Sequence, residues 1–183
     1  MKLKPKEKVI ASALTLFSQY GFHATGIDTI LAHSKVAKTT LYRHFRSKEE
    51  LIIAVLRQRD GDFRNWLMRT IDKSNLDPKD KLFLVFDMHK QWAEEPDFNG
   101  CTFIKASSEY PSLNSLIHTV SIEHKKAMTR YLEKILEEAK QTNAALLALQ
   151  LMLLIDGATV AAQMHRDPTV FDKAKTAAQQ LFA

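Results

Sequence analysis

The sequence is poor in the residues that crosslinks, metal sites and tight turns require. It contains a single cysteine, Cys101, which excludes an internal disulfide and a paired zinc–thiolate site. Glycine and proline number only 5 each, too few for a turn-rich β-sandwich or a disordered linker. The sequence also lacks glycine-rich phosphate loops and the H-E-x-x-H motif of metalloproteases. We therefore expect a helical protein that has no cofactor and no metal and is not an enzyme.

Long uninterrupted hydrophobic runs are also missing. The opening residues, MKLKPKEKVIASAL, contain no apolar stretch long enough for a signal peptide. The most apolar segment, residues 144–164, is interrupted by Gln150, Asp156 and Gln163, whereas a membrane span needs roughly 20 apolar residues. We interpret this segment as a buried or interface helix, and we expect a cytoplasmic protein with no membrane partner.

The excess of positive charge is confined to the first third of the chain. Residues 1–60 contain 11 Lys and Arg against 5 Asp and Glu, a net charge of +6. Residues 61–183 contain 15 against 16, a net charge of −1. This distribution fits a small module that binds the phosphate backbone of a nucleic acid, although a solvated, lysine-rich helix would give the same count.

Apolar residues recur at helical spacing almost throughout, and no segment shows a convincing strand pattern. Known signals mark the helix ends: Gly21 follows the first helix, Ser47 and Glu50 form a capping box, and Asp77 precedes a proline. The sequence predicts an all-α fold of about nine helices, near residues 9–20, 25–33, 38–44, 47–71, 77–96, 99–110, 113–136, 144–165 and 167–181.

The segment TGIDTILAHSKVAKTTLYRHFRSKEELI, residues 25–52, predicts two short helices with a break at residues 34–36, followed by a capped third helix. In the second short helix, Leu41 and Phe45 lie four residues apart and can form a buried back face. The polar front can then enter a DNA major groove. We expect groove contacts from Lys38, Thr39, Tyr42, Arg43 and His44, and phosphate contacts from Thr25, Thr40, Tyr42 and Lys48.

This stretch resembles the tetracycline-repressor-like (TetR) family of bacterial transcriptional regulators over about residues 6–55. The resemblance implies an all-α homodimer with an N-terminal three-helix, helix-turn-helix DNA-binding domain, residues 1–46. It also implies a C-terminal domain, residues 47–183, that binds a small effector and forms the dimer interface. The matching residues are Ala13-x-x-Leu16-Phe17, Gly21, Thr25, Ile30, Thr40 to Phe45 and Ser47 to Leu51.

One residue departs from the pattern of the family. Lys35 stands in the turn where members of the family usually have glycine. If the backbone there has a positive φ, a residue other than glycine costs about 1 kcal/mol. We expect the fold to absorb this cost, and Lys35 can add a phosphate contact.

The C-terminal part contains aromatic and methionine side chains that can either line a cavity or fill a core. The resemblance favours a mainly apolar effector site, with His89 and Asp156 as polar anchors. Asp156 can instead cap a neighbouring helix or pair across the dimer. The candidate effector-binding residues are Trp66, Phe86, His89, Trp92, Phe103, Met128 and Asp156.

The apolar density of residues 144–155 predicts a dimer interface through helices 144–165 and 169–181. Its candidate contacts are Leu146, Leu149, Leu153 and Val160. Together with the DNA-binding segment, this predicts a sequence-specific repressor that a small effector releases from its operator. The alternatives are a constitutive DNA-binding protein or an activator without a small-molecule ligand.

The sequence offers no convincing catalytic set or metal site, and one glycine lies inside a predicted helix. Cys101, His124 and Glu109 could be proposed as a thiol catalytic set, but nothing in their spacing supports it. His89, His118 and His124 lack the spacing of metal ligands. Gly61 interrupts helix 47–71, either because a neighbour packs closely there or because the helix bends.

Overall fold

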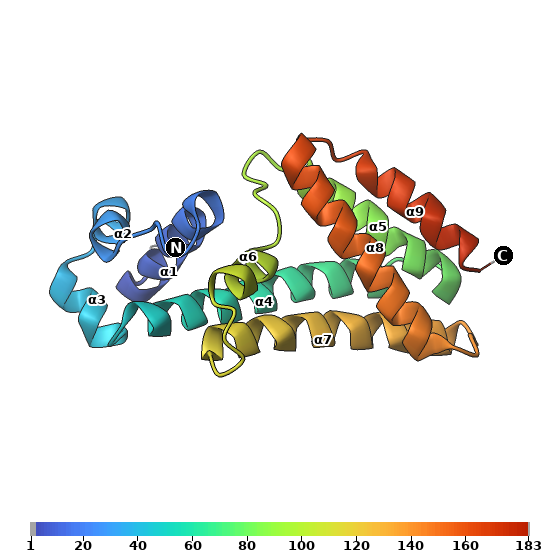
Figure 1. Ribbon diagram of the computed structural model, residues 1–183, viewed down its shortest axis with the longest axis horizontal. Helices are drawn as coiled ribbons and strands as arrows, with labels where there is room; N and C mark the ends of the chain where they lie inside the picture. The colour runs from blue at the N-terminus through green and yellow to red at the C-terminus, as the bar shows by residue number, and fades with distance from the viewer. Residues whose placement is uncertain (1–2, 183) are drawn as a thin grey trace. The chain divides into compact units, whose positions relative to one another are not determined.

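The computed structural model describes residues 3–182, and within them it contains nine α-helices and no strand (Figure 1). The all-α prediction is therefore confirmed. The helices are α1 Pro5–Tyr20, α2 Ile27–Ser34, α3 Lys38–His44, α4 Lys48–Asp72, α5 Pro78–Ala93, α6 Thr102–Glu109, α7 Leu116–Glu138, α8 Ala144–His165 and α9 Val170–Gln180.

The chain forms two compact units whose boundaries fall inside α4 and α7. The first unit extends to Asp62 and also contains Thr102–His124. The second unit contains Phe63–Cys101 and continues from Lys125. The division expected from the sequence, residues 1–46 and 47–183, concerns function rather than compactness, and it stays a prediction.

The first unit is built around α1, which contacts both α2 and α3 (Figure 1). Val9, Ala13 and Phe17 recur every four residues on one face of α1, and all three are fully buried. Phe22 follows the helix and packs on Phe17, with ring centroids 4.9 Å apart. Helices α2, α3 and α4 also contribute fully buried residues, namely Ile30, Leu41, Leu51, Ile52, Val55 and Leu56.

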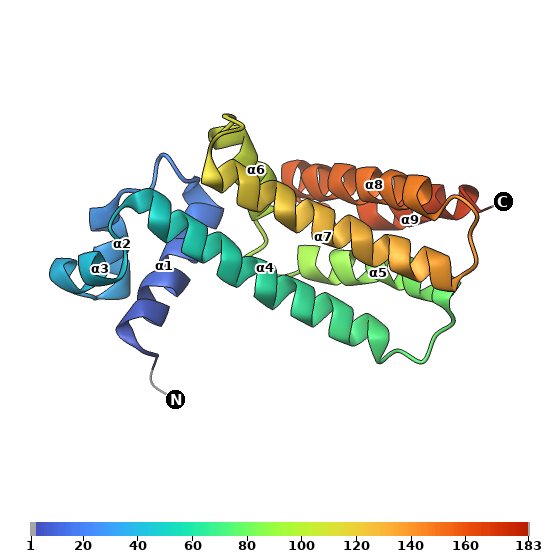
Figure 2. The same cartoon turned by 90° about the horizontal axis from the view of Figure 1, so that it is seen from below.

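The second unit is a bundle in which α8 and α9 contact each other and both contact α5 (Figure 2). The carboxyl-terminal parts of α4 and α7 complete its apolar cluster, with Leu67 and Ile71 from α4 and Leu132 and Leu136 from α7, all fully buried. Burial of one such side chain contributes about 1.5–3 kcal/mol. Burial of this cluster is therefore the main favourable contribution to the stability of the bundle.

Both predicted N-cap residues accept a backbone N–H group. The Glu50 backbone N–H donates to the Ser47 hydroxyl at 3.1 Å, but the Glu50 carboxylate accepts the backbone N–H of Arg46, at 2.7 Å, rather than that of Ser47, so one half of the predicted capping box is formed. Asp77 is the N-cap of α5, and its carboxylate accepts the backbone N–H of Asp80 at 2.9 Å. Such a cap typically contributes about 1 kcal/mol to helix stability.

Four helices begin later than the sequence predicts. Helix α7 begins at Leu116 rather than near residue 113, because residues 113–114 form a turn that the Ser115 backbone N–H closes on Ser112 O at 2.9 Å. Gly26, not Thr25, is the N-cap of α2. Helix α6 begins at Thr102 rather than near residue 99, because Gly100 has a φ of +78°, outside the helical region. Helix α9 begins at Val170, because Asp167 accepts both the backbone N–H and the hydroxyl of Thr169 in a local turn.

Gly61 lies inside α4, which continues through it without a break. A Cβ built at Gly61 would meet no atom within 4 Å. The explanation by close packing, left open by the sequence, is therefore wrong. By contrast, a Cβ at Gly21 would lie 2.8 Å from Glu109 Oε1, and Gly21 has a φ of +88°.

The same substitution should have opposite effects at these two glycines. Gly61→Ala should raise the free energy of unfolding by about 0.5–1 kcal/mol, since it removes the entropy cost of a helical glycine. Gly21→Ala should lower it, because the new Cβ is both strained and crowded. Urea unfolding at one fixed protein concentration measures both changes, and a destabilised Gly61→Ala protein would contradict this account.

Candidate nucleic-acid interface

Helix α3 is attached to the first unit by one face only. Leu41 is fully buried and Phe45, the residue after the helix, is 2% exposed. Tyr42 is 45% exposed. Seven residues are too few for a helix to be stable alone, so this back face holds α3 in place. The other exposed side chains of the helix are polar or basic, namely Lys38, Thr39 and Arg43.

Thr40 and His44 lie on the flank of α3 rather than on its exposed front. Both are half-buried, and they are one helical turn apart. The His44 ring lies 6.3 Å from the ring of Phe45. We therefore expect the centre of the interface at Lys38, Thr39, Tyr42 and Arg43, with Thr40 and His44 at its edge.

The turn between α2 and α3 has the geometry that the family pattern implies. Lys35 is the C-cap of α2 with φ 55° and ψ 34°, and its backbone N–H donates to Leu31 O at 2.9 Å. The positive φ is confirmed. A lysine there costs about 1 kcal/mol relative to glycine, and its exposed ammonium adds positive charge beside α3.

Two lysines at this surface already have partners. Lys48 is the first residue of α4, and its ammonium donates to His23 O at 3.3 Å. Lys38 pairs with Asp28 of α2 at 3.3 Å. Both members of the Lys38–Asp28 pair are well exposed, so the pair contributes little to stability and DNA can compete for the ammonium.

Thr25 requires a correction. Its side chain is 2% exposed. Its hydroxyl donates to Gly21 O at 2.7 Å and lies 3.3 Å from Leu16 O. The hydroxyl is therefore turned into the protein, and the expected side-chain contact with a phosphate is wrong. Thr25 instead closes the turn between α1 and α2.

Two family models cover most of the chain. The model of bacterial regulatory proteins of the tetR family matches residues 9–55. The model of the C-terminal domain of tetracyclin repressor-like proteins matches residues 78–178, more than half of the chain. The chain belongs to the TetR family.

Curated relatives and solved structures agree with this assignment. RutR of Escherichia coli strain K12, an HTH-type transcriptional regulator, is 49% identical over 53 residues, which are 29% of this chain. That alignment spans only 25% of the length of RutR. NemR of the same strain, an HTH-type transcriptional repressor, is 22% identical over 139 residues, 75% of this chain and 70% of NemR. A TetR-family transcriptional regulator from Streptomyces coelicolor has a TM-score of 0.89 and 27% identity, over 96% of this chain and 93% of that one.

In this TetR-family chain, sequence reasoning missed the residues of α6 that contact the turn between α1 and α2. Glu109, the last residue of α6, accepts the backbone N–H groups of Phe22 at 2.9 Å and His23 at 2.6 Å. His23 Nε2 donates to Glu109 O at 2.9 Å, and the His23 ring stacks on Tyr110 with centroids 4.7 Å apart. The E-Y pair before Pro111 is visible in the sequence, but nothing there indicates contacts more than 80 residues away.

Five of the candidate effector residues belong to one aromatic and apolar cluster of the second unit. Trp66, Phe86, Trp92 and Met128 lie in or against the same core cluster. His89 is 4% exposed, and its Nδ1 lies 2.7 Å from Val85 O. Rings from α4 and α5 contact one another directly, so plain core packing explains these side chains as well as a ligand does. Their role as effector contacts stays a prediction.

The other two candidates have different surroundings. Asp156 of α8 forms an ion pair with Lys125 of α7. Burial opposes the charge on Lys125, but Cys101 and Asp156 outweigh it and hold the pKa of the ammonium above its usual value. Phe103 lies in the first unit, where its ring stacks on His124 with centroids 3.7 Å apart. His124 pairs with Asp60 at 2.7 Å.

Helix α8 has two apolar faces. One is buried in the second unit, and the other leaves Leu146 56%, Leu149 55% and Leu153 73% exposed. Val160 and Met164 continue this exposed face. By length and composition α8 could also cross a membrane, but one such helix is weak evidence for a membrane protein, because core helices pass the same test. The four predicted interface residues therefore share one exposed, apolar side of the helix.

The role of the Thr25 hydroxyl can be tested by a nearly isosteric change. Thr25→Val leaves the buried carbonyl of Gly21 without this donor, so it should lower the free energy of unfolding by about 1–3 kcal/mol. Thr25→Ser keeps the hydroxyl and should lose less. Urea unfolding measures both. A Thr25→Val protein with parental stability would show that the hydroxyl does not hold the turn.

Proposed function

We propose that this TetR-family chain is a homodimeric transcriptional repressor that binds a DNA operator through α3 and releases it when a small effector binds. The observation that carries the proposal is the exposed face of α3. Tyr42 and three neighbouring polar or basic residues project from a helix whose back is fully buried at Leu41. A rigid helix with such a front can read base edges in the major groove.

The charge of the first unit supports the same function. The net charge of +6 in residues 1–60 supplies the attraction to phosphates that dominates protein–DNA affinity. Lys48 stands at the N-terminus of α4, where backbone N–H groups also favour an anion. The site of action is accordingly the cytoplasm, where bacterial DNA is found.

The exposed face of α8 supports the dimer. Three leucines that are more than half exposed lie on one side of this helix, and a contiguous exposed apolar patch often marks a protein–protein interaction site. A two-fold axis along this face pairs α8, with α9 beside it, into a four-helix bundle. Two copies of α3 then bind half-sites about 34–36 Å apart on a pseudo-palindrome.

The proposed effector is a small, mainly apolar molecule. The candidate contacts are the aromatic and methionine residues around Trp66, Phe86 and Trp92, with His89 and Asp156 as polar anchors. An effector releases DNA only if it binds the DNA-free conformation more tightly. Operator and effector must then weaken each other by the same factor, which titrations in both directions can show.

Tyr42 and Lys48 should differ in how they affect DNA binding. Operator fragments selected from genomic DNA by the parent protein serve as probes in fluorescence anisotropy. Tyr42→Ala should cost about 1–3 kcal/mol on the operator and relax its sequence preference. Lys48→Ala should weaken all sequences alike and lower the salt slope by about one unit.

A scrambled duplex provides the control for both variants. If Tyr42→Ala binds the operator as the parent does, α3 is not the recognition helix. If the parent binds operator and scrambled duplex equally, the chain is a constitutive DNA-binding protein rather than a specific repressor.

The dimer can be disrupted at its proposed centre. Leu153→Glu places a charge on the exposed face of α8, where burial against a second copy would be costly. We expect sedimentation at micromolar concentration to show a dimer for the parent and a monomer for this variant, with loss of operator binding. Leu113→Glu is the matched control, since Leu113 is 78% exposed but lies on the loop before α7. A monomeric parent would refute the dimer.

A further inference from the structure

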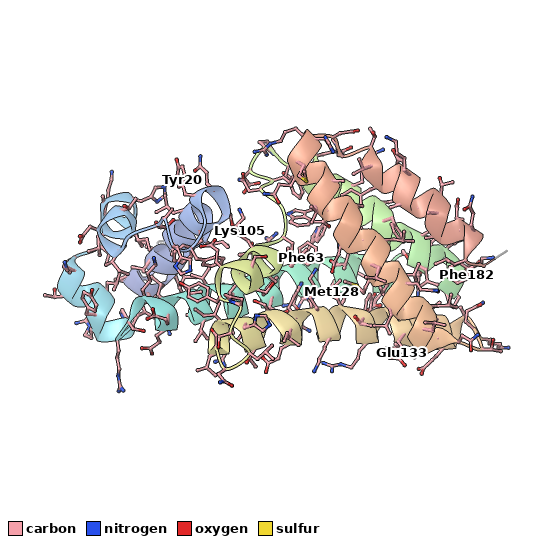
Figure 3. All side chains as sticks on the ribbon, viewed as in Figure 1. Tyr20, Phe63, Lys105, Met128, Glu133 and Phe182 are labelled. Atoms are coloured by element: carbon pink, nitrogen blue, oxygen red, sulfur yellow. The ribbon has the colours of Figure 1, made fainter. Side chains whose placement is uncertain are left out.

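Helix α6 holds the turn between α1 and α2 at more than one point. Besides the contacts of Glu109, the ammonium of Lys105 (labelled in Figure 3) donates to Ser18 O at 2.6 Å, at the carboxyl end of α1. Gly21 leaves no room for a side chain beside the Glu109 carboxylate. All of these residues belong to the first unit, together with α2 and α3.

The same turn also contacts Lys48, which is proposed to bind phosphate. His23 is bound on both sides: its backbone N–H donates to Glu109 and its carbonyl accepts the ammonium of Lys48. A single residue therefore connects the carboxylate of α6 to the first residue of α4. Hydrogen bonds to a carboxylate are charge-assisted and therefore strong. The bond from the His23 backbone N–H to Glu109, at 2.6 Å, is also shorter than the bond from Lys48 to His23 O, at 3.3 Å.

We infer that Glu109 is a positioning residue for DNA binding. It contacts no DNA itself; through the His23 backbone it fixes where the Lys48 ammonium meets the operator phosphate. Helix α6, outside the helix-turn-helix segment, thereby becomes part of the DNA-binding machinery. This inference rests on the proposed function, because it presumes that Lys48 contacts a phosphate.

The sign of the expected effect separates positioning from simple charge. By Coulomb's law alone, removing a carboxylate from a DNA-binding protein strengthens binding, since one repulsion with the phosphates disappears. If Glu109 positions Lys48, its removal weakens binding instead. The two explanations therefore predict opposite changes in affinity for the same substitution.

Glu109→Gln is the decisive variant. A glutamine offers one acceptor oxygen where two backbone N–H groups need one each, and its NH₂ group faces the other N–H. We expect operator affinity to fall roughly tenfold, because the binding-competent position of the turn is less populated. The slope of log K against log salt should also fall by about 0.9, the value of one lost phosphate contact.

A double-mutant cycle with Lys48→Ala tests the connection itself. If Glu109 acts through Lys48, then Lys48→Ala should cost much less affinity in the Glu109→Gln background than in the parent. A merely structural role of Glu109 would lower stability but leave the two effects on affinity additive. Urea unfolding of every variant establishes that each protein is folded under the conditions of the binding assay.

Two further variants complete the design. Glu133→Gln, on a half-buried glutamate of α7 in the second unit (Figure 3), makes the same change of charge and should not weaken binding. His23→Phe keeps the backbone contacts and the stacking on Tyr110 but loses the bond from Nε2, so it should cause a smaller loss than Glu109→Gln. If Glu109→Gln does not fold, Glu109→Asp takes its place in the cycle with Lys48→Ala, because it keeps the charge but withdraws the carboxylate by one methylene from the two backbone N–H groups that it accepts.

The possible outcomes separate the inference from the function on which it rests. A parent that binds no operator refutes the proposed function, and the inference falls with it. A parent that binds, together with a folded Glu109→Gln protein of equal or higher affinity and unchanged salt slope, refutes the inference alone. Additive effects of Glu109→Gln and Lys48→Ala refute it as well.

Discussion

Burial of the back of α3 is the interaction on which the DNA-facing surface depends. Helix nucleation is unfavourable, and a helix of this length does not persist in water without support. Leu41 supplies that support inside the first unit, and Phe45 seals the carboxyl end of the helix. Because these two side chains hold the helix in place, the polar side chains on its exposed face are not needed for folding. One face of this seven-residue helix therefore stabilises the fold, and the opposite face is available to bind DNA.

Most of the fold could be predicted from the sequence, because its signals are local. The spacing of apolar residues gave α3 and α8 with their observed bounds, and Asp77 with the following proline marked the start of α5. The errors also have local causes. Threonine is a common N-cap residue, but the Thr25 hydroxyl donates to Gly21 O instead of capping α2. Helix α6 begins after Gly100 because this residue has a positive φ, which the sequence does not reveal.

The site could be predicted only where its residues are close in sequence. The exposed residues of α3 follow from a four-residue spacing, whereas the contacts of Glu109 with Phe22 and His23 join distant segments. A glutamate beside a tyrosine has no pattern that predicts a backbone N–H partner. The same limit applies to Asp156, because its partner Lys125 lies 31 residues earlier in the chain and was not among the alternatives that the sequence suggested. Long-range partners require the tertiary structure, since many pairings satisfy the same local sequence.

The close fit of Gly21 and Glu109 has an evolutionary consequence. The carboxylate occupies the space that any side chain at position 21 would need. A lineage that replaced this glycine would have to rebuild the turn as well as shorten or remove the glutamate, because a φ of +88° by itself demands glycine. The dependence therefore runs one way: the glutamate requires glycine at position 21, whereas the turn requires that glycine even without the glutamate. Among related proteins that keep this turn, the glycine should therefore persist where the glutamate has been lost.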